Sequence, residues 1–152
     1  MPPSEAKDNL IWTSLLAVLA GIGTPSTDWL TAPVVAEGIP SDALPAVDEI
    51  PRIYLHHSRT GYPSEGPPGP KHRRRTHFDA YVCAKDARTA NRVQSDILRA
   101  IRSAEGALTT AYGQPVYDGP EEFTRRDDLS RAGVHVAVQP LFIDHETDHT
   151  AT

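Results

Sequence analysis

The chain is short of cysteine, of aromatic residues and of long apolar runs, and each shortage excludes a class of protein. One cysteine, Cys83, stands among 152 residues, so neither an internal disulfide framework nor a cysteine-based zinc site can form. Aromatic residues make up 7% of the chain, and the core must therefore be small and aliphatic. The longest apolar stretch, residues 10–22, falls far short of the ~20 residues that cross a bilayer.

The first 22 residues fit two interpretations. Residues 15–20 are similar to the apolar centre of a signal peptide followed by small residues, but signal peptides begin with a positive segment, whereas Glu5 and Asp8 flank Lys7 here. We favour an amphipathic first helix of a cytoplasmic protein, with Ser4 as its N-cap. Its apolar residues fall on one helical stripe: Ile11, Leu15, Val18, Leu19 and Ile22.

Proline is abundant and predicts long irregular connections. The 14 prolines are about twice the number expected from an average usage of roughly 5%. Residues 24–51 are predicted to form an irregular connection in which Val34 and Val35 are apolar anchors. Residues 58–72 are predicted to form a mobile hairpin loop, because the prolines of residues 61–70 lack backbone donors and the glycines lose entropy on ordering.

Two strands and a second helix occupy the middle of the sequence. Residues 52–57 and 74–84 alternate with period two, which predicts an antiparallel hairpin with Phe78, Ala80 and Val82 facing inward. A helix follows, capped by Asp86 and ended by Gly106. Its apolar stripe is Val93, Ile97, Ala100, Ile101, Ala104 and Leu108, and the residues expected on its opposite face are Arg92, Asp96, Arg99, Arg102 and Ser103.

The C-terminal part completes the predicted fold. Val134, Val136 and Val138 alternate along a last strand that continues to Ile143, and residues 145–152 are predicted to be a flexible tail. Residues 1–144 are therefore predicted to be one α+β domain. It has two helices packed on one face of a four-stranded, mainly antiparallel sheet, with long irregular loops.

The residues predict no catalytic, cofactor or metal site, so the chain is not expected to be an enzyme. His56 and His57 are adjacent on a strand and point to opposite faces, and His145 and His149 fall in the predicted tail, where they could hold an adventitious ion only weakly. Neither a Gly-x-Ser-x-Gly nor a Gly-x-Gly-x-x-Gly pattern occurs. Cys83 lies in a strand, where free cysteines are more often packed than nucleophilic.

Two charged segments are the candidate contact sites of a chain whose net charge is −5. This acidity disfavours a protein that coats nucleic acid. Residues 71–75 either contact a phosphate backbone or an acidic partner surface, or are a solvated strand start that discourages edge aggregation. Residues 125–128 are either a polar turn or half of a contact in a symmetric ring. The candidate contact residues are Arg73, Arg74, Arg75, Arg125, Arg126, Asp127 and Asp128.

The order of predicted elements resembles the tail terminator family of long-tailed phages, of the type of the lambda minor tail protein U. The resemblance is carried by the helix at residues 90–104, the strand at residues 76–84 and the segment at residues 125–140. This segment reads Arg-Arg-Asp-Asp-Leu-Ser-Arg-Ala-Gly-Val-His-Val-Ala-Val-Gln-Pro. The connection at residues 24–51 and the loop at residues 61–70 depart from the family's pattern.

The resemblance implies a structural virion protein. In that family, a small subunit forms a hexameric ring that caps the tail tube, stops its polymerisation and offers the head connector a docking surface. The implied partners are further copies of the chain, the tail tube protein and the head-tail connector protein, with passing contact to genomic DNA in the lumen and no membrane. The implied location is the tail-neck junction of a virion assembled in the host cytoplasm.

Two other hypotheses remain open at this point. A head-completion or neck adaptor would join portal and tail, and sequence hardly separates it from a terminator. A small nucleic-acid-binding module would use the basic residues 71–75.

Overall fold

The computed structural model describes residues 7–22, 34–38, 40, 45, 50–61, 71–113, 115–117, 123–131 and 133–148. At Lys7, Val34 and residues 59–61, 71–73, 115–117 and 146–148 it describes the backbone alone. The predicted N-cap Ser4, residues 62–70 of the predicted hairpin loop and residues 149–152 of the predicted tail lie outside the described residues.

Three helices and six strands are present in the described residues. In chain order they are α1 Lys7–Ala20, β1 Val34–Glu37, β2 Arg52–Gly61, β3 Lys71–Ala84, α2 Ala87–Ser103, α3 Glu105–Ala111, β4 Pro115–Tyr117, β5 Thr124–Arg125 and β6 His135–Asp148. The α+β class is as predicted, but the predicted two helices and four strands are too few.

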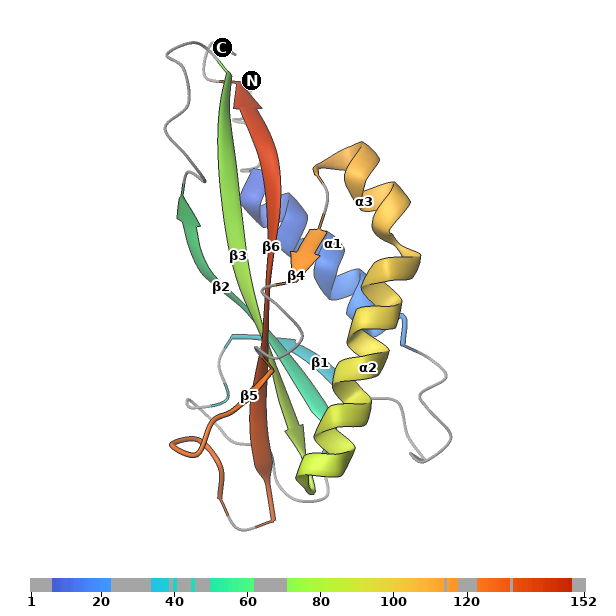
Figure 1. Ribbon diagram of the computed structural model, residues 1–152, viewed down its shortest axis with the longest axis vertical. Helices are drawn as coiled ribbons and strands as arrows, with labels where there is room; N and C mark the ends of the chain where they lie inside the picture. The colour runs from blue at the N-terminus through green and yellow to red at the C-terminus, as the bar shows by residue number, and fades with distance from the viewer. Residues whose placement is uncertain are drawn as a thin grey trace.

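One mixed sheet organises the molecule, in the order β1-β2-β3-β6-β4, with the short β5 also paired to β6. The strands β3 and β6 pair antiparallel along their full length, from Lys71 opposite Asp148 to Ala84 opposite His135, and they cross the whole molecule in Figure 1. The antiparallel pairing of β2 with β3 was predicted and is confirmed. The parallel pairing of β1 with β2 was not predicted, because four residues are too short for a period to show.

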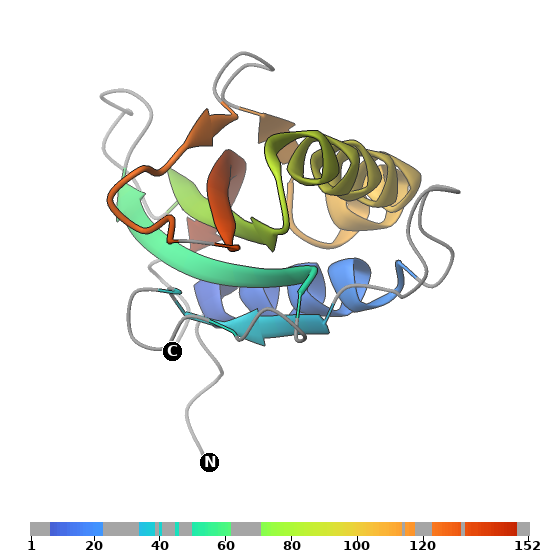
Figure 2. The same cartoon turned by 90° about the horizontal axis from the view of Figure 1, so that it is seen from below.

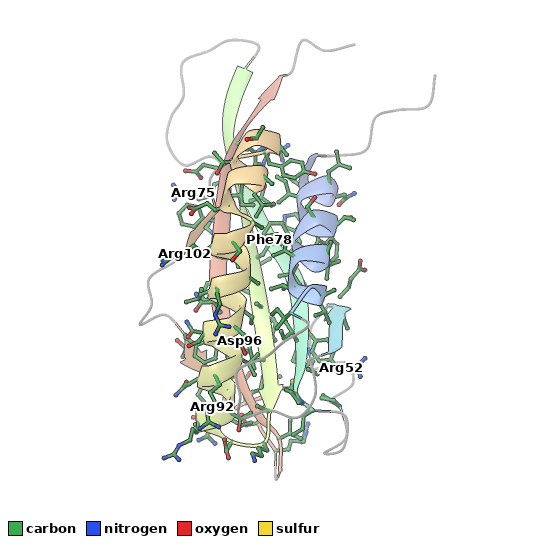
Figure 3. All side chains as sticks on the ribbon, turned by 90° about the vertical axis from the view of Figure 1, so that its right-hand side faces the viewer. Arg52, Arg75, Phe78, Arg92, Asp96 and Arg102 are labelled. Carbon is green, nitrogen blue, oxygen red and sulfur yellow. The ribbon has the colours of Figure 1, made fainter. Side chains whose placement is uncertain are left out.

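The helices α1 and α2 lie side by side on one face of this sheet (Figure 3). Both bury most of the predicted aliphatic stripe. Val18 and Ala100 are half-buried and Leu108 lies in α3, while the following residues are at most 1% exposed: Ile11, Leu15, Leu19, Val93, Ile97 and Ile101. These stripes pack on Phe78, Ala80 and Val82, the residues predicted to face inward, in one core cluster. Burial of each large aliphatic side chain contributes roughly 1.5–3 kcal/mol to stability, which explains why the stripes determine this layer.

The other face of the sheet carries a smaller core. Tyr54, Tyr81 and Cys83 pack there with Val134 and Val136, and Leu129 lies against them. Leu129 and Val134 belong to the segment between β5 and β6, drawn in orange-red on the side of the sheet away from the helices in Figure 2. Around Tyr54, Tyr81 and Cys83 the sheet is therefore covered on both faces.

Four predictions need correction. The helix α2 ends at Ser103, and Gly106 lies inside the additional helix α3, where a Cβ would meet open space, so this glycine is no stop signal. Residues 145–148 continue β6 and are not tail. Residues 58–61 and 71–72 belong to β2 and β3, which shortens the predicted loop. Asp96 was predicted on the solvent face of α2 but is 2% exposed.

Candidate subunit interface

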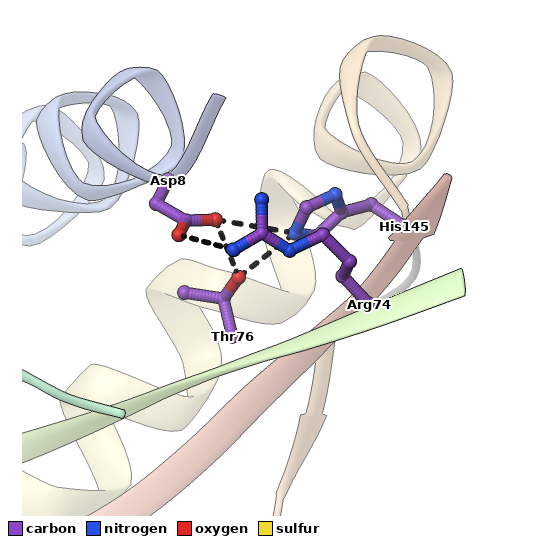
Figure 4. A network of polar contacts seen from close by, with 4 residues as sticks. All are labelled: Asp8, Arg74, Thr76 and His145. Atoms are coloured by element: carbon purple, nitrogen blue, oxygen red, sulfur yellow. Dashed lines mark hydrogen bonds and ion pairs between the residues drawn. The ribbon is translucent and has the colours of Figure 1, made fainter. Parts of the chain in front are cut away.

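Arg74 joins a network of polar side chains that fastens the start of α1 to the sheet (Figure 4). Its guanidinium lies 3.5 Å from Oδ2 of Asp8. The hydroxyl of Thr76 donates to Oδ1 of Asp8 at 2.9 Å and lies 2.8 Å from Nε2 of His145. Since the single hydroxyl proton points to the carboxylate, Nε2 of His145 must carry the proton of the second bond. The network thus joins the buried Thr76 and His145 to the half-buried Asp8 and Arg74.

Strand geometry explains why these residues meet. Arg74 and Thr76 share the face of β3 that carries Phe78, because alternate side chains point the same way. His145 lies opposite Arg74 in the β3–β6 register, and Asp8 lies in the first turn of α1. Sequence reasoning missed His145, although the alternation of Leu141 and Ile143 continues to it and could have found it.

Arg75 points to the opposite face of β3 and is also paired. Its Nε donates to Oδ1 of Asp144 at 2.7 Å, and its Nη2 donates to Oδ2 at 3.1 Å. The guanidinium lies 4.0 Å from the centre of the Phe142 ring. The ring of His77 lies against the same phenyl ring, with 5.5 Å between the two ring centroids. Arg73 lies in β3 with its side chain outside the described residues. The described arginines of the basic run thus already neutralise carboxylates of their own chain.

Residues 125–128 lead from the end of β5 into a turn, and their charges are paired with each other. Arg125 contacts Asp127 at 2.6 Å, and Arg126 donates two bonds to Asp128 at 2.9 and 2.8 Å. The hydrogen bond from Arg126 lowers the pKa of Asp128, and the same bond raises the pKa of Arg126. Arg126 also lies 5.9 Å from the ring of Tyr81. Since Arg125, Asp127 and Asp128 are largely exposed and Arg126 is partly exposed, these pairs can exchange partners at little cost.

The two charged segments do not form one site. Arg75 lies opposite Asp144 and Arg125 lies opposite Ala137 on β6, so they are seven residues apart along that strand. At a rise of about 3.3 Å per residue this separation is roughly 23 Å. The sheet therefore carries one charged cluster near each end.

The described residues offer little for catalysis. Cys83 is buried, and desolvation raises the pKa of its thiol to about 12, which keeps it protonated. Among the described residues, no group of three or more His, Cys, Asp and Glu side chains could hold a metal ion. Thr76 has the His and Asp neighbours of a nucleophile, but it is 0% exposed and no substrate can reach it.

Comparison of the sequence with models of protein families and with curated proteins finds no match. No helix in the described part of the chain is long and apolar enough to cross a bilayer.

Proposed function

We propose that this chain is a phage tail terminator subunit, which forms a ring on the end of the tail tube, stops tube growth and presents a docking surface to the head connector. The order α1, β2, β3, α2 and the segment 125–128 leading into β6 support the resemblance that motivates this proposal.

The separation of the two charged clusters is the observation that carries the proposal. A ring is built from head-to-tail contacts, in which each subunit uses two different surfaces. Arg74 and Arg75 lie toward one end of the β3–β6 pair, and residues 125–128 lie toward the other end. Both clusters hold exposed or half-exposed ion pairs, which can be exchanged for pairs across a subunit boundary.

Negative-stain electron microscopy and sedimentation of the purified chain, with and without tail tubes, test this function. We expect rings with a central hole, and monomers under both conditions would refute the proposal. Arg125→Glu combined with Arg126→Glu should prevent rings, whereas Arg88→Glu combined with Arg102→Glu, on the exposed face of α2, should leave them intact.

Particles assembled without the protein distinguish the neck-adaptor hypothesis from the terminator proposal. Overlong tail tubes support a terminator, while normal tubes with leaky filled heads support an adaptor and contradict the proposal. The nucleic-acid hypothesis is less favoured, because the chain is acidic, with a net charge of −5. Salt-sensitive binding of DNA or RNA that is lost in Arg74→Glu would revive it.

A further inference from the structure

The outward face of α2 carries a straight stripe of arginines. Arg88, Arg92, Ser95, Arg99 and Arg102 follow the 4-3-4-3 spacing that places residues on one side of a helix. Arg92 is half-buried and the other four residues are exposed. At a rise of about 1.5 Å per residue the stripe is roughly 21 Å long. In Figure 3 the helix α2 faces the viewer, and Arg92 and Arg102 are labelled along it.

The charge of this stripe contrasts with the charge of the rest of the protein. The helix α2 holds four arginines and one aspartate and so carries +3, which leaves −8 on the remainder of a chain with a net charge of −5. The aspartate is Asp96, whose side chain is 1% exposed and lies 2.6 Å from Arg99. It neutralises Arg99 from within the protein and presents no anion at the surface. The cations that α2 offers to a partner are therefore chiefly Arg88, Arg92 and Arg102.

Helix stability does not explain the stripe. Arg88 lies in the first turn of α2, where the positive end of the helix dipole disfavours a cation. Arg88 and Arg92 are also like charges at positions i and i+4, which repel each other. The carboxylate of Asp86 attracts Arg88 and offsets part of this cost. A row of charges that weakens its own helix indicates a role outside the helix.

The composition of this face indicates a phosphate backbone as the partner. A protein partner requires an apolar or aromatic centre in the contact, whereas α2 contains no aromatic residue and exposes a single apolar residue, Ala87. Binding of single-stranded nucleic acid relies on aromatic rings that stack with the bases. Arginines flanked by short hydroxyl and amide side chains, here Asn91, Ser95 and Ser103, are the groups that contact the phosphates of a duplex.

We infer that the arginine stripe of α2 contacts the phosphate backbone of double-stranded DNA without reading its sequence. Each strand carries one phosphate per about 3.4 Å of helix axis, so a stripe of roughly 21 Å passes about six phosphates, and Arg88, Arg92 and Arg102 can each neutralise one. The charge of −8 on the rest of the chain repels DNA, so the contact is weak and does not coat the duplex. The contact does not rest on the proposed function, because one copy of the chain carries the whole stripe. It also differs from the nucleic-acid hypothesis above, which uses residues 71–75.

Fluorescence anisotropy of the full chain with a labelled DNA duplex of about 20 base pairs, between about 50 and 200 mM salt, tests this surface. Wild type should bind more tightly at the lower salt concentration, and the logarithm of its affinity should fall with the logarithm of salt with a slope of about −3, for three neutralised phosphates. Arg88→Glu combined with Arg102→Glu should lower the affinity by about tenfold or more and flatten this slope. A wild type that does not bind at the lower salt concentration, or a double variant that binds like wild type, would overturn the inference.

A matched pair of single variants separates the stripe from net charge. Arg102→Glu and Arg131→Glu make the same change at two exposed arginines, one on the stripe and one in the segment between β5 and β6. Arg102→Glu should weaken binding about fivefold, whereas Arg131→Glu should stay within about twofold of wild type. Equal losses in the two variants would mean that DNA responds only to the total charge of the protein, and no stripe would be needed.

Competition identifies the class of partner. Unlabelled duplexes of unrelated sequence should displace the labelled duplex equally well, and poly-glutamate at the same concentration of charge should displace it poorly. Poly-glutamate that competes as well as DNA would assign the stripe to acidic proteins and overturn the assignment to phosphates. The variant with Arg88→Glu and Arg102→Glu is expected to keep its rings, so loss of DNA binding and loss of ring assembly are separate results.

Discussion

The helices α1 and α2 pack on the same face of the same sheet, yet they present opposite chemistry to solvent. Both bury an aliphatic stripe to 1% exposure or less. Outward, α2 exposes Arg88, Arg99 and Arg102, whereas the exposed residues of α1 are uncharged: Asn9, Leu10, Thr13, Ala17 and Ala20. The inner stripe of a helix determines where it packs, and the outer face determines which surroundings it suits.

The two helices also begin differently. The first turn of α2 is capped by a neighbour in sequence, because the side chain of Asp86 accepts a hydrogen bond from the backbone N–H of Thr89 at 2.8 Å. The start of α1 depends on residues far away in sequence, since Asp8 contacts Thr76 on β3 and His145 on β6. The first device can be recognised in the sequence, and the second exists only once the sheet has formed.

The largest expected effect concerns the inner stripes, in which the helices are alike. Leu15→Ala in α1 and Ile97→Ala in α2 should each lower the free energy of unfolding by about 2–5 kcal/mol, because each leaves a cavity in the shared core. Urea denaturation measures both values. The control Leu10→Ala, on the exposed side of α1, should cost far less, and a similar loss there would mean that Leu10 is part of the core.

The next effect concerns the polar attachment of α1. Thr76→Val removes the buried hydroxyl that bonds to both Asp8 and His145, so two hydrogen bonds are lost and the free energy of unfolding should fall by about 1–3 kcal/mol. Denaturant titration measures it, with the exposed Thr109→Val as a matched control. An unchanged midpoint in Thr76→Val would show that the network does not hold α1 in place.

A smaller, pH-dependent effect is expected at the start of α2. The backbone N–H of Thr89 lowers the pKa of Asp86, so the ionised cap stabilises the fold above the ordinary aspartate pKa of about 3.9. This contribution is lost as the pH falls through the lower folded value. Asp86→Ala should therefore be less stable than wild type at neutral pH, and the difference should shrink in acid. Asp86→Asn keeps an acceptor without titrating and should show a weaker pH dependence in the same thermal unfolding series.

The smallest effects on stability are expected on the two outer faces. Arg102→Ala and Ala17→Glu should each change the free energy of unfolding of the monomer by no more than about 0.5 kcal/mol, because both positions are exposed. Thermal unfolding at low concentration measures this. A strongly destabilising Ala17→Glu would mean that Ala17 is part of the core, and the contrast between the outer faces of the two helices would disappear.

Much of the fold was determined by the sequence alone. The stripes of α1 and α2, the inward residues Phe78, Ala80 and Val82, and the cap at Asp86 follow from periods of 3.6 and 2 and from local hydrogen bonding, which each segment carries in its own residues. The uncharged composition of residues 9–22 is likewise visible in the sequence.

Only the tertiary structure decided the rest. The parallel pairing of β1, the burial of Asp96 and the inclusion of residues 145–148 in β6 depend on neighbours distant in sequence. The predicted contact residues were separated for the same reason. Strand register placed Arg75 beside Asp144 and residues 125–128 roughly 23 Å away, and the packing of α1 on the sheet placed Arg74 beside Asp8. Local patterns specify which face of an element is apolar, whereas register and packing specify which charged groups meet.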